Sequence, residues 1–324
     1  MRKRKKYGLI IFLLITFSIL VFIAKEFLYE EENKIYKISV IIRGKSSESW
    51  MITKEGIDQA ATDMNVDISF IALSDENSLY EQKELVKREV DDGADAIIIS
   101  PTDYEKMDET IKNVIEKIPV VLMESTIKSG ENIPYISCDN YKLGRSLAEE
   151  MIQSGNYRKN IAVVNSSSEC SSIRERYNGF IDVINESKNN YVLWNIDFND
   201  EGVYESIKKL IEEKNVDVIV ALEPSALEVI AQGKKELISQ FKEDIFAEIY
   251  GVGSTSKIIA LLEEGIINSI IVQNDFNVGY LSVQAAMDTL NGEEYKNRKI
   301  EFSIINKRNM YSDENQRLLF PFVR

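Results

Sequence analysis

The stretch best suited to chemistry spans residues 159–184, KNIAVVNSSSECSSIRERYNGFIDVI, and carries Arg174 and Arg176. An apolar run typical of a buried strand is followed by a polar loop, and apolar residues then recur at helical spacing from Ile173 to Ile184. In open α/β sheets, ligands bind beyond the carboxyl ends of the strands, where this loop must lie. A guanidinium group there can donate hydrogen bonds to two neighbouring ligand oxygens, because its N–H donors lie in one plane. The alternative is a surface arginine on an amphipathic helix.

The residue inventory argues against catalysis. The chain has no histidine, which excludes a histidine-based triad, a histidine metal site and a Cys–His nucleophile pair. Its two cysteines, Cys138 and Cys170, form either one disulfide or two buried thiols. Gly251-Val252-Gly253 lacks the third glycine of a dinucleotide-binding loop, and the sequence has no phosphate loop, metal-ligand cluster or nucleophile elbow. We therefore expect no enzyme activity, no cofactor and no metal.

Apolar strands and amphipathic helices alternate along the chain from Tyr36 onward. The expected strands cover residues 37–43, 67–73, 95–100, 119–123, 134–137, 160–165, 191–196, 217–222, 248–253 and 269–272. The pattern restarts with a helix after residues 139–140, and a last helix is expected over residues 277–290. Such alternation predicts parallel sheets covered by helices. Because roughly 290 residues exceed the size that one core supports, we expect two lobes.

The sequence S-S-I-R-E-R-Y-N-G-F after a buried strand resembles the matching unit of the type I periplasmic sugar-binding proteins. That family includes the ribose-binding proteins and the ligand-binding cores of LacI-type repressors. The resemblance implies an α/β fold with two doubly wound parallel-sheet lobes joined by a hinge, and chain crossings near residues 138–140, 273–275 and 304–307. Lobe one is then expected to contain residues 36–138 plus 275–304, and lobe two residues 139–274 plus 305–324.

The resemblance also implies a ligand cleft between the lobes. In the family the second arginine of the R-x-R pair, here Arg176, forks onto sugar hydroxyls. The first cleft segment, residues 43–50, carries Arg43, Ser47 and Trp50. An indole ring can pack on the CH face of a sugar. Trp50 has a structural alternative, since a large aromatic residue also seals a helix against a sheet.

Other positions agree with the family pattern only in part. Phe198 and Gln273 match an aromatic wall and a polar residue of the ribose binders, whereas Glu124 and Glu223 replace other polar residues and would act as acceptors. Gly253 stands where the family has an aspartate that takes two hydroxyls, which argues against ribose itself. The expected binding residues are Arg43, Ser47, Trp50, Glu124, Arg176, Phe198, Glu223 and Gln273.

The N-terminus predicts a membrane anchor. Residues 2–6 are all basic, and residues 7–24 carry no charge and are rich in Ile, Leu, Phe and Val, about the length that crosses a bilayer core. The basic tail, residues 1–6, should stay cytoplasmic, and residues 25–35 should form a stalk outside. A cleaved signal peptide is the alternative, although Phe22 and Ala24 make a poor cleavage site. We expect a single-pass plasma-membrane protein with an extracytoplasmic binding domain.

These features predict a membrane-anchored solute-binding protein that closes on a sugar or similar small polar ligand. The net charge of −14, or −19 without the basic tail, would repel nucleic acid. The expected partner is an ABC permease or a sensor kinase, and a fixed tether favours a resident neighbour such as the kinase. The protein itself is expected to be a monomer. Two alternatives are a LacI-like ligand-sensing core in a regulatory protein without DNA binding and a nucleotide-dependent enzyme of doubly wound fold.

We predict that the protein fractionates with membranes and keeps its apolar segment, because bulky residues end that segment where a cleavage site needs small ones. Membrane fractionation followed by intact-mass measurement checks this prediction. A soluble form whose N-terminus lies near Lys25 would contradict it.

Overall fold

The computed structural model describes residues 14–19, 34–165, 169–196, 200, 202–213, 216–241, 247–293, 295 and 299–320. The chain divides into two units, residues 1–36 and residues 37–324. In the first unit, residues 14–19 form a helix, and its Leu14 and Phe17 side chains are exposed. Within the described residues, no helix has both the length and the apolar content needed to cross a membrane. The rest of the predicted anchor lies outside the described residues.

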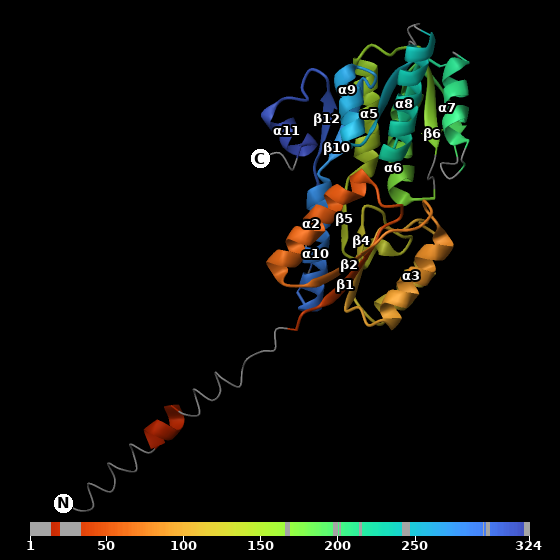
Figure 1. The fold of residues 1–324 in the computed structure, drawn as a ribbon. Coiled ribbons are helices and arrows are strands. Elements are labelled where there is room, and N and C mark those ends of the chain that lie inside the picture. Colours follow the sequence, from red (N-terminus) through yellow and green to blue (C-terminus); the bar gives the residue numbers. More distant parts are fainter. Residues whose placement is uncertain are drawn as a thin grey trace, which may run out of the picture. The chain divides into compact units, whose positions relative to one another are not determined.

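The second unit contains two lobes, each built on one six-stranded sheet (Figure 1). The elements that run from the start of this unit to the first crossing are β1 (Lys37–Ile41), α2 (Glu48–Met64), β2 (Asp67–Ile71), α3 (Leu79–Asp91), β3 (Ala96–Ile99), α4 (Asp108–Ile115), β4 (Val120–Met123), the 3-10 helix η1 (Gly130–Asn132) and β5 (Tyr135–Cys138). Then follow α5 (Asn140–Gln153), β6 (Asn160–Asn165), α6 (Ser171–Glu186), β7 (Asn190–Asn195), α7 (Val203–Glu212), β8 (Val218–Ala221), α8 (Pro224–Phe241), β9 (Glu248–Val252), α9 (Ser256–Glu264) and β10 (Ser269–Gln273). The chain ends with α10 (Asp275–Leu290), β11 (Lys299–Ile300), β12 (Phe302–Asn306) and α11 (Asp313–Leu319).

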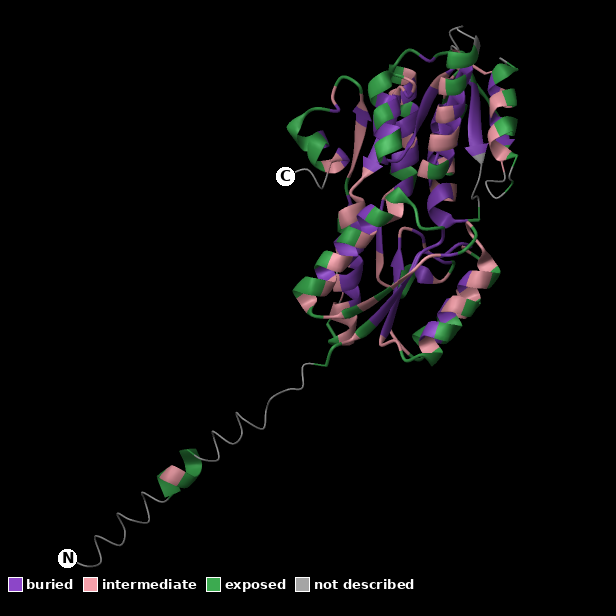
Figure 2. Ribbon diagram, viewed as in Figure 1, coloured by how far each residue is buried: buried purple, intermediate pink, exposed green. Residues whose placement is uncertain are grey.

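The two sheets repeat one topology. The strand order is β11-β5-β4-β3-β1-β2 in the first lobe and β12-β10-β9-β8-β6-β7 in the second. The strand pairs are parallel except for β12, which runs antiparallel to β10. Central strands β3, β4 and β8 are buried along their whole length, as expected for parallel strands covered on both faces by helices (Figure 2). The predicted α/β fold with two doubly wound lobes is confirmed.

The chain crosses between the lobes three times, and the first two crossings end in capped helices. Asp139 precedes α5 and accepts a hydrogen bond from the Lys142 amide, and Asn274 precedes α10 and accepts one from the Asn277 amide. Such caps satisfy amides that the first helical turn leaves free. Each of these two crossings passes directly from a strand of one lobe into a helix of the other.

The third crossing lies earlier than the sequence suggested. Residues 302–304 were expected in lobe one, but β12 begins at Phe302 and pairs with β10 of the second sheet, while β11 pairs with β5 of the first. The chain therefore changes lobe at Glu301. The run KIEFSIIN contains no glycine or proline to mark the change, so only the strand pairing locates it.

Two helix pairs pack through reciprocal glycine contacts, one pair in each lobe. In the second lobe, a Cβ atom on Gly144 of α5 would lie 1.9 Å from the Arg176 carbonyl oxygen, and one on Gly179 of α6 would lie 2.0 Å from the Tyr141 carbonyl oxygen. In the first lobe, Gly56 of α2 and Gly279 of α10 approach each other's helix equally closely. Because glycine has no side chain, the helix backbones touch, and the backbone of Arg176 is held in place.

We predict that Gly144→Ala lowers the free energy of unfolding by about 3 kcal/mol, because the new methyl group must push α6 away. Gly233→Ala in α8 is the matched control, since its Cβ would meet side chains no closer than 3.5 Å. That change should alter stability by less than about 1 kcal/mol. Chemical denaturation of both variants measures the difference, and equal effects would show that the α5–α6 contact tolerates a side chain.

Candidate functional site

A cavity of about 160 Å³ lies between the two lobes at the carboxyl ends of their strands. Residues from both lobes line it, including seven of the eight that the sequence pointed to: Arg43, Ser47, Trp50, Glu124, Arg176, Glu223 and Gln273. The eighth, Phe198, lies outside the described residues. Parallel sheets place their ligand loops at this edge, which explains why residues distant in sequence meet here.

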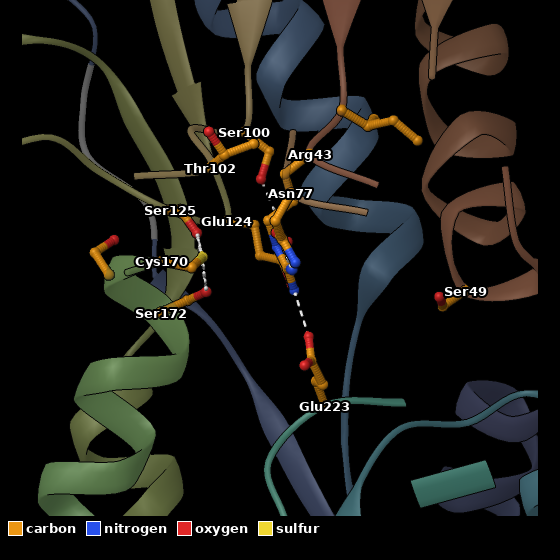
Figure 3. A network of polar contacts seen from close by, with 12 residues as sticks. Arg43, Ser49, Asn77, Ser100, Thr102, Glu124, Ser125, Cys170, Ser172 and Glu223 are labelled. Carbon is orange, nitrogen blue, oxygen red and sulfur yellow. Dashed lines mark hydrogen bonds and ion pairs between the residues drawn. The ribbon is translucent and has the colours of Figure 1, made fainter. Parts of the chain in front are cut away.

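Arg43, two residues beyond the end of β1, crosses the cleft (Figure 3). Its Nη2 atom lies 3.3 Å from Glu223 Oε2 in the second lobe, and its Nε atom lies 3.4 Å from Glu124 Oε2 in the first. A third bond runs from Nη1 to Asn77 Oδ1 at 3.1 Å. Arg43 is only 5% exposed, so these partners compensate a charge that water does not reach. One guanidinium group thus links both lobes.

Glu124 has a strained backbone. Its φ angle is +63°, in the left-handed region that a side chain with a Cβ atom rarely adopts. The surrounding structure holds this conformation, because the Glu124 carbonyl oxygen accepts hydrogen bonds from Tyr135 and Ser137 and its amide donates to the Ile136 carbonyl. Strain of this kind gathers at functional sites, where it aims a side chain. Here the backbone turns the carboxylate toward both cleft arginines.

Arg176 enters the cavity from the first turns of α6. It is 1% exposed, and it donates from Nε to Asn140 Oδ1 at 2.8 Å and from Nη1 to the Leu222 carbonyl at 3.0 Å. Its Nη2 atom has no hydrogen-bond partner among the described residues and lies 3.8 Å from Glu124 Oε1. The side chain is therefore buried and fixed in direction, and its Nη2 donor lacks an acceptor among the described residues.

Trp50 and Ser47 line the cavity from the start of α2. Trp50 is partly buried and also packs against buried core residues, so it both seals the helix and faces the cleft. Ser47 precedes the helix at its N-cap, and its hydroxyl lies 3.1 Å from that of Ser49. Both interpretations of Trp50 from the sequence are compatible with this position.

Asp275 belongs to the site although the sequence did not indicate it. This aspartate opens α10, lines the cavity, and accepts a hydrogen bond of 2.7 Å from the Gln273 amide. Gln273 in turn accepts one from the Cys138 thiol at 3.1 Å. Burial raises the pKa of Asp275 to about 7, helped by the Glu124 carboxylate and opposed by the Gln273 hydrogen bond and the Arg176 charge. One feature of the sequence could have identified Asp275: it is an acidic residue two positions after Gln273, at a predicted crossing.

Gly253 differs from the family pattern for a structural reason. Its φ angle is +142°, and a Cβ atom there would lie 2.8 Å from the Ile258 side chain and 2.9 Å from that of Pro224. An aspartate cannot occupy this position without a shift of the backbone and its neighbours. The cleft therefore carries its carboxylates elsewhere.

Several contacts join the two lobes around the cavity. Glu48 at the start of α2 accepts a hydrogen bond of 2.8 Å from the Ser256 amide, which is the first of α9. On the other side, Ser125 lies 2.8 Å from the Cys170 sulfur and 2.9 Å from the Ser172 hydroxyl (Figure 3). The Arg174 guanidinium lies 4.1 Å above the Tyr104 ring, within the range of a cation–π contact. The lobes are thus closed on the cavity.

The chemistry of the lining suits binding. Both cysteines are free thiols and buried, and burial raises the pKa of Cys138 to about 11, which keeps it protonated. In the described part of the chain, no group of Cys, Asp or Glu residues is arranged to hold a metal ion. The lining combines fixed donors, fixed acceptors and one indole ring, which is how proteins orient a small polar ligand.

Comparison with known proteins agrees with this geometry. A sequence model of the periplasmic binding protein domain matches residues 38–294. The chain belongs to the periplasmic binding protein family. The proteins that the chain resembles include sugar-binding transport proteins.

Three relatives of this periplasmic binding protein show the range of similarity. The ribose import binding protein RbsB of Bacillus subtilis (strain 168) is 20% identical over 264 residues, which cover 81% of this chain and 84% of RbsB. An ABC transporter solute binding protein from Agrobacterium vitis with bound D-fucose matches with a TM-score of 0.80 and 21% identity, over 88% of this chain and 100% of that one. A chain of the XylFII–LytSN complex matches with a TM-score of 0.76 and 22% identity, over 85% of this chain and 98% of that one.

We predict that Asp275→Asn stabilises the ligand-free protein more at pH 8 than at pH 4.5. In the unfolded chain an aspartate ionises near pH 4, whereas in the fold Asp275 keeps its proton up to about pH 7. Ionisation therefore lowers the stability of the parent progressively as the pH rises from about 4, and fully above about 7. Other charges near this carboxylate are those of Glu124 and Arg176, with the Cys138 thiol adjoining.

The Tm of parent and variant, measured across this pH range, checks the prediction. Asp288→Asn, in the last turns of the same helix, removes the same charge about 20 Å away and should show no such pH trend. A gain in Tm that is equal at both pH values would mean that Asp275 ionises normally in the fold.

Proposed function

We propose that the protein is a membrane-tethered solute receptor whose two lobes close on one small, polar, ring-shaped ligand outside the cytoplasm. The observation that carries the proposal is the cavity itself, because both lobes contribute buried, oriented polar groups to it. A cavity of about 150 Å³ holds a single six-membered ring, so about 160 Å³ suits a monosaccharide-sized molecule. Arg43, Arg176, Glu124, Glu223 and Gln273 would supply the polar contacts, with Trp50 and Ser47 beside them. Phe198 is proposed as a further contact from the family resemblance alone.

The bound ligands of similar proteins support the choice of ligand class. D-fucose is bound in the Agrobacterium vitis structure, and RbsB is named for ribose import. Charged hydrogen bonds contribute roughly 1.5–3 kcal/mol each, so a few of them in a closed cleft suffice for micromolar binding. A reaction is not part of this proposal, because the lining offers binding groups rather than an activated nucleophile.

The proposed partner is a sensor kinase in the same membrane. The apolar segment at residues 7–24 would fix the receptor beside such a neighbour and raise its effective concentration. The name of the XylFII–LytSN complex records that a structurally similar chain assembles with a second protein. An ABC permease is the second candidate, favoured by the import role in the name of RbsB. In either case we propose a monomeric receptor that signals by closing.

We predict that a bound ligand slows alkylation of Cys170. This thiol is 0% exposed and lies at the N-terminus of α6, against Ser125 of the other lobe, so it becomes accessible only when the lobes part. The full-length chain in mild detergent, with Cys138→Ser to leave one thiol, is first screened by thermal shift against sugars, polyols and nucleosides. A ligand at 100 times its dissociation constant adds about 2.7 kcal/mol to stability.

Each compound that raises the Tm should then slow Cys170 alkylation in proportion to its occupancy. The Cys138→Ser, Cys170→Ser double variant defines the background of the labelling assay. A compound that raises the Tm while Cys170 reacts at the unliganded rate would place binding outside the cleft. If no compound of the three classes raises the Tm, the proposed function is wrong.

A further inference from the structure

The cavity carries more carboxylates than cations. Among the described residues its lining includes Glu76, Glu124, Glu223, Glu228 and Asp275, against the two guanidinium groups of Arg43 and Arg176. In a closed cleft such an excess is unfavourable, because few water molecules remain to screen it. This excess is the starting point for identifying the ligand more closely than as a sugar.

The two arginines are already engaged with two of the carboxylates. Arg43 pairs with Glu124 and Glu223 at 3.4 and 3.3 Å, and Arg176 lies nearest to Glu124. Asp275 has no ion pair among the described residues, and the contact that its carboxylate makes is the neutral amide of Gln273. The site therefore presents a buried carboxyl group that forms no ion pair among the described residues, and a cation beside it would favour its ionised form.

A second, independent observation comes from Arg176. Its Nη2 atom is buried in a side chain that is 1% exposed, and it has no acceptor in the described part of the chain. The separation of 3.8 Å from Glu124 Oε1 is too long for a hydrogen bond. A buried donor without an acceptor costs about 1–3 kcal/mol, so a ligand atom is expected to complete it.

We infer that the ligand is a monosaccharide-sized polyol bearing a protonated amine, as in an amino sugar. The ammonium group pairs with Asp275, and a hydroxyl or ring oxygen accepts from Arg176 Nη2. This inference rests on the proposed function and narrows its ligand class. A neutral sugar would leave the negative excess in place, and a phosphorylated or carboxylated sugar would increase it. The described residues offer no metal-binding cluster that would favour a divalent cation instead.

The test compares matched ligand pairs by isothermal titration calorimetry on the full-length chain in mild detergent at pH 7. The probes are D-glucosamine, D-galactosamine and D-mannosamine, each beside its neutral parent hexose and its N-acetyl derivative, with D-fucose and D-arabinose as further neutral sugars. One charge-assisted pair should make at least one amino sugar bind about tenfold or more tightly than its parent and its N-acetyl form.

The variants assign that preference to one residue. Asp275→Asn should abolish the preference, measured within the variant as the ratio of amino-sugar to neutral-sugar affinity, and its melting curve verifies that the variant is folded. Asp288→Asn removes the same charge from the far end of α10 and should retain the preference.

A neutral sugar that binds as tightly as its amino counterpart would overturn the inference and leave the proposed function standing. A preference that survives in Asp275→Asn would also overturn it, because the ammonium would then pair elsewhere. If none of the amino, N-acetyl or neutral sugars binds, both the inference and the proposed sugar-like ligand fail.

Discussion

The closed arrangement of this protein depends on how it compensates two buried guanidinium groups. Arg43 and Arg176 are 5% and 1% exposed, and removing such a charge from water costs several kcal/mol unless partners replace the water. Arg43 takes Glu124 from its own lobe and Glu223 from the other, so closure of the lobes completes its coordination. The cleft is thus held together by its own polar groups as well as by any ligand.

Closure of the cleft requires lobes that are each rigid, and one tightly packed helix pair in each lobe supplies this rigidity. The α2–α10 and α5–α6 pairs bring backbone against backbone through glycines, in the same way in both lobes. In each pair one helix begins directly after a crossing, at Asn274 or Asp139. The chain passes between the lobes at Asp139, Asn274 and Glu301, so we expect motion between the lobes to be concentrated there, as in a hinge.

The cleft lacks the aspartate that the family resemblance places at residue 253, and other positions carry its carboxylates. Gly253 cannot carry a side chain at its φ angle of +142°, so an acceptor is lost at that edge. Carboxylates appear instead on Glu124, which is held at a φ angle of +63°, and on Asp275 at the start of α10. Because hydrogen-bond geometry and charge decide which small molecule fits, family membership does not determine the ligand of this cleft.

The sequence by itself determined the βα alternation and the two lobes, and its resemblance to a known family indicated seven residues that line the cavity, including Arg43, Arg176 and Gln273. It could do so because strand and helix periods are local, and ligand loops follow the carboxyl ends of strands. Tertiary structure alone decided that Arg43 meets Glu223, which is 180 residues away, and that the chain changes lobe at Glu301. It also decided that Asp275 is buried beside Gln273. Burial and pairing of charges depend on how the two lobes approach each other, and no local pattern encodes that distance.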